Sequence, residues 1–172
     1  MKTYLIIINI ISFFIYFTKI DFLITIITIL GGSIGELINL ILFDRRFTKE
    51  NMMNKILIIA TFIIQVILFI LLNKKTINFN PEILNNKFFL IYLILINLIT
   101  FLIFYLDKQR AIKNKWRFKI TSLLSLCLLG GEIGAISSMY IFNHKTNVNY
   151  FTKGIPLIII VHFLILLLLM NI

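Results

Sequence analysis

The feature that most constrains this chain is a succession of six long apolar runs, separated by short basic or asparagine-rich stretches. Within a lipid bilayer, a backbone must satisfy its own hydrogen bonds, so we predict that each run is a helix. The expected fold is an all-α, polytopic membrane protein with six transmembrane helices. The runs are Thr3–Thr18, Phe22–Phe43, Ile56–Asn73, Phe88–Leu106, Ile120–Phe142 and the segment from Ile155 to the C-terminus.

The composition favours a membrane location and argues against several functions. Hydrophobic residues make up 60% of the chain, more than in ordinary soluble domains. The net charge is +10, and the basic residues lie at the ends of apolar runs, where anionic phospholipid headgroups are the nearest partners. We therefore expect contact with the lipid bilayer and no binding of nucleic acid. One cysteine and two separated histidines predict no metal site, and we expect no cofactor.

Two segments that lie 99 residues apart match without a gap, LGGSIGELINLILF at residues 30–43 and LGGEIGAISSMYIF at residues 129–142. They contain six of the seven glycines of the chain. Such self-similarity indicates an internal repeat. We assign residues 1–76 to a first three-helix repeat, residues 77–87 to a polar linker and residues 88–172 to a second three-helix repeat.

Three helices are an odd number, so two repeats that fold alike must enter the membrane from opposite sides. The sequence therefore predicts an inverted-topology repeat. Eleven Lys and Arg residues lie on the side of the two termini and six lie on the other side. By the positive-inside rule, we expect a multi-pass protein of the cell membrane with both termini in the cytoplasm. A homo-oligomer is left open.

The second half carries three motifs in order, an Asp-Lys pair, a Trp-Arg pair, and a glycine cluster followed by a His-Lys-Thr triplet. The residues concerned are Asp107, Lys108, Ala111, Trp116, Arg117, Gly130, Gly131, Gly134, Met139, Phe142, His144, Lys145 and Thr146. In these residues the chain resembles domain of unknown function family 1294, small bacterial integral membrane proteins of three spans. The resemblance implies two fused copies, of which the second is better preserved, and it implies no activity.

The glycine clusters and two carboxylates form the first candidate site. Paired glycine-broken helices mark transporter binding sites, whereas glycines four residues apart also form packing seams, and both readings stay open. Charged groups are rare inside membrane spans, and those that occur contact water, pair with another group or have a function. We expect the second and fifth spans to cross at their glycines, so that both carboxylates share one polar cavity. The candidate substrate-binding residues are Gly31, Gly32, Gly35, Glu36, Gly130, Gly131, Glu132 and Gly134.

The basic segments at the ends of the spans form a second candidate site. They suit either an anionic headgroup, with a lysine as point charge and a histidine as proton donor, or simple anchoring at the membrane surface. His162, alone in the last apolar run, is expected to be a hydrogen-bonded packing residue. The candidate headgroup-binding residues are Arg45, Arg46, Asp107, Lys108, Trp116, Arg117, His144 and Lys145.

These features predict a small membrane transporter or permeation protein with a site in mid-membrane. One alternative is a membrane-embedded enzyme or accessory factor that acts on lipid headgroups. Another is a structural partner of a different membrane complex. Whether the protein is an enzyme is left open, and the catalytic residues are unknown.

The predicted topology can be checked by labelling single cysteines after Cys127 has been replaced. Cysteines placed at Asn80 and Asn147 should react with a membrane-impermeant thiol reagent added to intact cells. A matched cysteine at Asn114, in the basic loop on the other side, should react only after the membrane has been opened. The opposite pattern would refute cytoplasmic termini.

Overall fold

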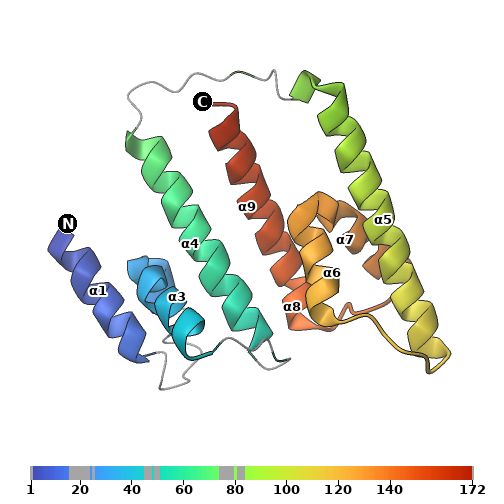
Figure 1. Ribbon diagram of the computed structural model, residues 1–172, viewed down its shortest axis with the longest axis horizontal. Coiled ribbons are helices and arrows are strands. Elements are labelled where there is room, and N and C mark those ends of the chain that lie inside the picture. The colour runs from blue at the N-terminus through green and yellow to red at the C-terminus, as the bar shows by residue number, and fades with distance from the viewer. Residues whose placement is uncertain are drawn as a thin grey trace. The chain divides into compact units, whose positions relative to one another are not determined.

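The computed structural model describes residues 2–15, 24, 26–44, 48, 51–73, 80 and 84–171. All regular elements in this part of the chain are helical, as predicted (Figure 1). The chain forms two compact units, Met1–Lys75 and Thr76–Ile172, which are called here the first and the second unit.

The first unit consists of a straight helix, a broken helix and a long helix. The broken helix packs against both of the others. Its two parts meet at a kink within a short, wide helical turn. The elements are α1 (Lys2–Ile15), the turn η2 (Thr28–Gly32), α3 (Ser33–Leu42) and α4 (Met52–Asn73).

The second unit has the same order of a straight, a broken and a final helix. Its first helix packs against all parts of the broken helix, and its last helix packs against the part that follows the kink. The elements are α5 (Lys87–Ile112), α6 (Ile120–Leu126), the turn η4 (Cys127–Gly131), α7 (Glu132–Ile141), the short α8 (Asn149–Thr152) and α9 (Gly154–Leu169).

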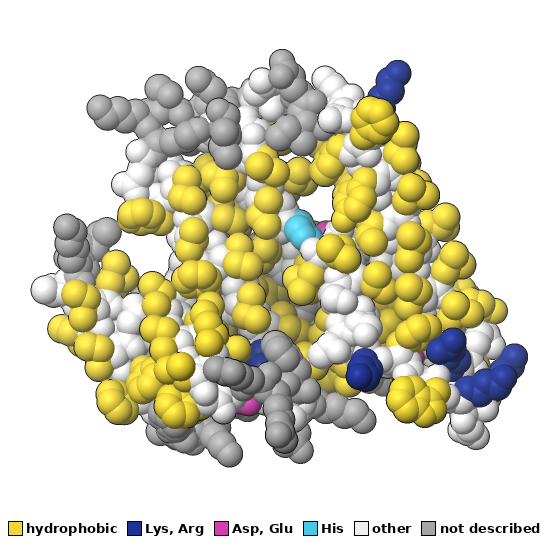
Figure 2. All heavy atoms as spheres, in the orientation of Figure 1, with side chains coloured by type: hydrophobic (Ala, Val, Ile, Leu, Met, Phe, Trp, Pro, Cys, Tyr) yellow, Lys and Arg dark blue, Asp and Glu magenta, His cyan; other side chains and the backbone are white. Residues whose placement is uncertain are grey.

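Among the described residues, four helices are long and apolar enough to cross a membrane, which supports a membrane protein. The two other predicted runs form shorter apolar helices, Thr3–Ile15 and Thr28–Leu42, and residues 16–23 between them lie outside the described residues. Hydrophobic side chains cover most of the face shown in Figure 2, and Lys and Arg side chains lie at the helix ends of the second unit. The four long helices are Met52–Asn73, Lys87–Ile112, Ile120–Ile141 and Asn149–Leu169.

Helix α5 is longer than predicted, because it continues past Leu106 to Ile112. Asp107 and Lys108, which directly follow the predicted run, are therefore helical. Asp107 is fully buried and has partners within the protein. Its carboxylate therefore does not need water, and the helix can continue past it. Arg110 lies in the last turn, where a positive charge is favoured by the helix dipole.

The first glycine of each cluster breaks its helix. Gly31 has φ of 112° and Gly130 has φ of 99°, in the left-handed region that other residues rarely adopt. The sequence left open whether the glycines break the two helices or only pack them, and the structure shows a break at Gly31 and at Gly130.

The last glycine of each cluster permits a close contact with the first helix of its own unit. A Cβ atom on Gly35 would lie 2.0 Å from the backbone oxygen of Asn9, and one on Gly134 would lie 2.0 Å from that of Asn97. We expected these glycines to let the two broken spans cross. In the structure each of these glycines lies against the first helix of its own unit, where its backbone N–H donates to the asparagine Oδ1 of that helix.

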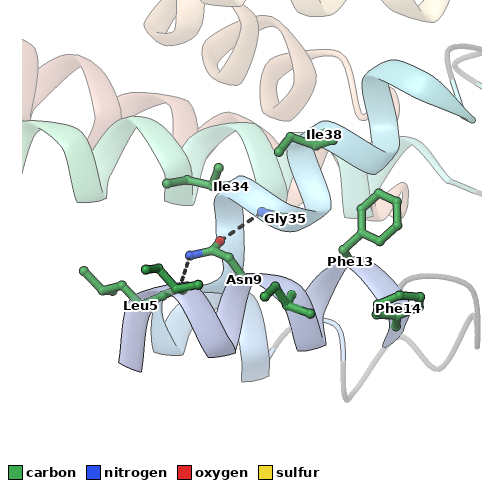
Figure 3. A pocket seen from close by; sticks show the side chains of 9 residues that line it. Leu5, Asn9, Phe13, Phe14, Ile34, Gly35 and Ile38 are labelled. Carbon is green, nitrogen blue, oxygen red and sulfur yellow. Dashed lines mark hydrogen bonds between the residues drawn. The ribbon is translucent and has the colours of Figure 1, made fainter. Parts of the chain in front are cut away.

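A groove of about 500 Å³ runs along the contact between α1 and α3 (Figure 3). Apart from Asn9, its lining side chains are apolar, and Glu36 does not line it. The Asn9 amide is used in hydrogen bonds within the first unit, so the lining offers a solute little polar surface. It is lined by Leu5, Ile6, Asn9, Ile10, Phe13, Phe14, Ile34, Gly35 and Ile38.

The close contact at Gly134 gives a test of this packing. Gly134→Ala should destabilise the protein by about 1–3 kcal/mol, because the added methyl group overlaps a backbone oxygen that cannot move freely. The neighbouring Ile133→Ala, at a side chain that is 67% exposed, is the matched control and should change stability little. Denaturant unfolding in detergent measures both. Equal stability of the two variants would contradict the packing described.

Candidate functional site

One asparagine on the first helix of each unit replaces the helical hydrogen bond that the break removes. In an uninterrupted α-helix, the Gly31 carbonyl would accept from the Gly35 N–H. Here the Asn9 side chain lies between them: Nδ2 donates to the Gly31 oxygen at 3.1 Å. Its Oδ1 accepts from the Gly35 N–H at 2.9 Å, a bond that Figure 3 shows. The second Nδ2 hydrogen is donated to the Leu5 carbonyl at 2.7 Å. Every group of the amide is therefore used.

The second unit has the same arrangement around Asn97. Its Nδ2 donates to the carbonyl oxygens of Gly130 and Leu93, at 2.9 and 2.8 Å, and its Oδ1 accepts from the Gly134 N–H at 2.8 Å. We call these two side chains the asparagine bridges. Each bridge satisfies backbone groups that would otherwise be left unpaired in an apolar environment.

A tyrosine one turn earlier on the same helix stabilises the carbonyl just before the break. The Tyr4 hydroxyl donates to the Leu30 oxygen at 3.0 Å, and the Tyr92 hydroxyl donates to the Leu129 oxygen at 2.6 Å. The break in each unit is therefore a fixed structural element with its own set of partners.

Our sequence prediction missed these partners, although the sequence contains a signal for them. YLIIINIISF at residues 4–13 matches YLILINLITF at residues 92–101, which lie 88 positions later. The glycine segments match at a spacing of 99 positions. An ungapped comparison finds only one of the two matches, because the connection between the first two helices has different lengths in the two halves.

Glu36 is fully buried in the first turn of α3. Its Oε2 contacts the Thr28 hydroxyl, and Oε1 has no hydrogen-bond partner among the described residues. The same hydroxyl lies 2.5 Å from the Ile24 carbonyl oxygen. Because a hydroxyl has one hydrogen, it cannot donate to both acceptors at once. A proton on Glu36 satisfies both contacts, with Glu36 donating to Thr28 and Thr28 donating to Ile24.

A neutral polar pair connects the first broken helix to the third helix of its unit. The Ser33 hydroxyl donates to Gln65 Oε1, and Gln65 Nε2 donates to the Thr28 carbonyl at 2.9 Å. These contacts hold α4 against the break.

An ionisable pair makes the corresponding connection in the second unit. Glu132, which aligns with Ser33, has its Oε1 2.9 Å from His162 Nδ1 on α9. His162 Nε2 lies 3.2 Å from the Leu128 carbonyl oxygen. Glu132 Oε2 is buried and has no partner in the described part of the chain. His162, expected to be a packing residue, is thus the partner of a predicted site residue.

A separate cluster surrounds Asp107 near the end of α5. The buried carboxylate is 2.8 Å from Lys145 Nζ, 2.9 Å from His144 Nε2 and 3.7 Å from Arg117. It also accepts from the Phe118 backbone N–H at 3.1 Å. This Asp107 cluster joins three segments that are distant in the sequence, and it brings together four of the predicted headgroup-binding residues.

Lys145 is held deep in this cluster. Its ammonium lies 4.7 Å from the ring centre of Phe151 and 5.8 Å from that of Phe104, and its backbone has a left-handed φ of 62°. Burial lowers the pKa of Lys145, whereas its hydrogen bond and ion pair with Asp107 act in the opposite direction. The charge of Lys145 is therefore largely committed to Asp107.

The remaining predicted headgroup-binding residues lie in different surroundings. Lys108 Nζ donates to the Phe142 carbonyl, at the end of α7. Trp116 is 85% exposed, and the Arg117 side chain is about half exposed. Arg45 and Arg46 lie outside the described residues.

Comparison with known proteins places the chain in a family. A family model described as "Protein of unknown function (DUF1294)" matches residues 97–151. The chain is also 36% identical to the uncharacterized protein YsdA of Bacillus subtilis (strain 168) over 70 residues, which are 41% of this chain and 79% of that relative. The chain belongs to the DUF1294 family. This confirms the resemblance seen in the sequence. No solved structure matches the chain.

The family match coincides with the best-defined structural features of the second unit. Residues 97–151 begin at the asparagine bridge, include the broken helix with Glu132, and contain the Asp107 cluster. The aligned residues form a much larger share of YsdA than of this chain, so the relative is only a little over half as long.

The Asp107 cluster gives a second stability test. Asp107→Asn leaves the Lys145 ammonium buried without a counter-charge and should cost about 3–5 kcal/mol, the usual effect of breaking a buried ion pair. The double variant Asp107→Asn/Lys145→Met removes both charges and should recover part of that loss. Unfolding in detergent is the measurement, with the exposed Lys115→Gln as control. An Asp107→Asn variant as stable as this control would show that the cluster contributes nothing to folding.

Proposed function

We propose that the protein is an integral membrane transporter or permeation protein whose site lies at its two glycine-broken helices. The supporting observation is that each break carries a buried carboxyl group with one oxygen that has no partner among the described residues. These oxygens are Oε1 of Glu36 and Oε2 of Glu132. A carboxyl group costs about 2.5–3.5 kcal/mol to place at the centre of a membrane helix, so it is seldom retained there without a task.

The position of the carboxyls supports this proposal. Both lie in the first turn of the helix segment that follows the break, where the helix dipole favours a negative charge. Each lies within five residues of the positive-φ glycine of its unit. Transporters that bind ions in mid-membrane use broken helices in this way. In this proposal the glycines shape the site and the carboxyls bind the transported species.

For the architecture, we propose two fused copies of one three-helix repeat in inverted topology. The two asparagine bridges and tyrosine contacts are equivalent contact by contact, which supports a common origin. The length of YsdA, a little over half that of this chain, fits a single copy. With six spans, both termini would lie in the cytoplasm of the cell, on the side that carries more Lys and Arg residues.

A second candidate function, binding of anionic phospholipid headgroups, is supported by the surroundings of the Asp107 cluster. Half-exposed Arg117 lies beside a carboxylate that already has two other basic partners, and Trp116, the residue before it in the sequence, is exposed. Such a loop suits the membrane surface. However, His144 and Lys145 are bound to Asp107, so little of the cluster is free to act on a headgroup. We therefore place this candidate second.

Substitution of the two carboxyls tests the proposed function. Purified protein in liposomes should dissipate an imposed gradient of H⁺, Na⁺ or K⁺ faster than empty liposomes. Glu36→Gln and Glu132→Gln keep the shape and hydrogen bonding of the side chain but remove its titration, and at least one should slow this flux by about 100-fold, the low end of the contribution of a positioned proton-transfer group.

The control for this experiment is Lys115→Gln, at an exposed residue away from both breaks, which should leave the flux unchanged. Wild-type flux in both glutamine variants would show that the carboxyls are packing residues. Absence of any flux with the wild-type protein would overturn the proposed function itself.

A further inference from the structure

The hydrogen bonds of His162 fix the number of protons that it shares with Glu132. The Leu128 carbonyl oxygen can only accept, so His162 Nε2, 3.2 Å away, carries a hydrogen. Nδ1 and Glu132 Oε1 are 2.9 Å apart, and a hydrogen bond between them needs one hydrogen on either atom. The pair is therefore an imidazolium with a carboxylate or a neutral imidazole with a carboxylic acid. Both forms have the same net charge.

We propose that Glu132 and His162 form a proton-exchange site and that the species bound there is the proton. This inference rests on the proposed function and names its ligand for the second unit. A proton that arrives forms an O–H bond at Glu132 Oε2, the oxygen without a partner. With the shared hydrogen on His162 Nδ1, the pair is then an imidazolium beside a carboxylic acid and holds one proton more. It returns to its resting state when the Oε2–H bond breaks and the proton leaves.

The location of the pair suits this exchange. Glu132 and His162 lie close to the middle of the candidate spans Ile120–Ile141 and Asn149–Leu169. Glu132 is almost completely buried, whereas the His162 side chain is 27% exposed, so the histidine is the member of the pair that lies nearer the surface of the unit. Carboxylate and histidine pairs in such positions are the usual elements of proton relays in membranes.

Few other titratable groups face the pair from the elements packed around it. Cys127 of η4 is buried and donates to the Leu123 carbonyl. Tyr92 of α5 donates to the Leu129 carbonyl. In the described part of α5, α6 and α9, no Lys, Arg or Asp side chain forms a hydrogen bond or ion pair with either member. The exchange is therefore a property of Glu132 and His162 together.

The first unit supplies the matched control, because it holds a neutral pair in the corresponding place. Ser33 and Gln65 connect the broken helix to the next helix without a titratable group. The double variant Glu132→Ser/His162→Gln transfers this pair to the second unit. It should fold, since the first unit already contains the same arrangement, but it has no proton to exchange at this position.

The first measurement is the pH dependence of ion flux in liposomes. The wild-type flux should change with pH, and Glu132→Ser/His162→Gln should lose this dependence together with about 100-fold of H⁺ flux. Flux of normal rate and unchanged pH dependence in the double variant overturns this inference and leaves the proposed function intact. Absence of all flux in the wild-type protein overturns the proposed function instead.

The second measurement does not depend on transport. In protein with ¹⁵N-labelled histidine and ¹³C-labelled glutamate, the ring nitrogens of His162 and the carboxyl carbon of Glu132 should change in one common pH transition. His162→Gln identifies the histidine signals, and Glu132→Gln should abolish the common transition. Two independent transitions, or a His162 signal that Glu132→Gln leaves unchanged, would show that the two groups share no proton.

Discussion

The structure depends on new hydrogen-bond partners for the backbone groups that lose their helical bonds where a glycine breaks the helix in an apolar environment. When the helix breaks at Gly31 or Gly130, a carbonyl and an N–H that would have bonded to each other are separated. The core of a bilayer contains no water to replace the lost hydrogen bond, and each unsatisfied N–H or C=O group there costs several kcal/mol. The asparagine bridges supply both missing partners from one side chain, and this fixes the distance and angle between the first helix and the broken helix of each unit.

The same interaction positions the candidate site. Because Asn9 and Asn97 hold the segment after the break in place, the first turns of α3 and α7 present Glu36 and Glu132 at defined positions. The third helix then completes each site with a polar side chain, Gln65 in one unit and His162 in the other. The two units are therefore alike in their scaffold and different in their chemistry. One keeps a carboxyl beside a threonine, and the other pairs a carboxyl with an imidazole.

Much of the fold could be predicted because membrane helices are specified by local composition. The apolar runs predicted the helices, whereas the two glycine clusters suited either a packing seam or a break, and the positive φ of Gly31 and Gly130 shows that they break. The length of α5 was underestimated, since charged residues such as Asp107 were assumed to end a helix. They do not end this one because Asp107 is neutralised by residues from two other segments, and a local reading of the sequence cannot include those partners.

The sequence by itself determined an all-helical class with helices apolar enough for a membrane and the presence of a carboxyl in two of the apolar runs, because these properties follow from neighbouring residues and the cost of exposing a backbone to lipid. Only the tertiary structure decided which groups meet. Glu132 contacts His162 thirty positions later, and Asn97 reaches Gly130 and Gly134 across a loop. Such contacts depend on how each helix is rotated about its axis and on the length of the connections, and in helices that are apolar on nearly every side, hydrophobic periodicity does not specify that rotation.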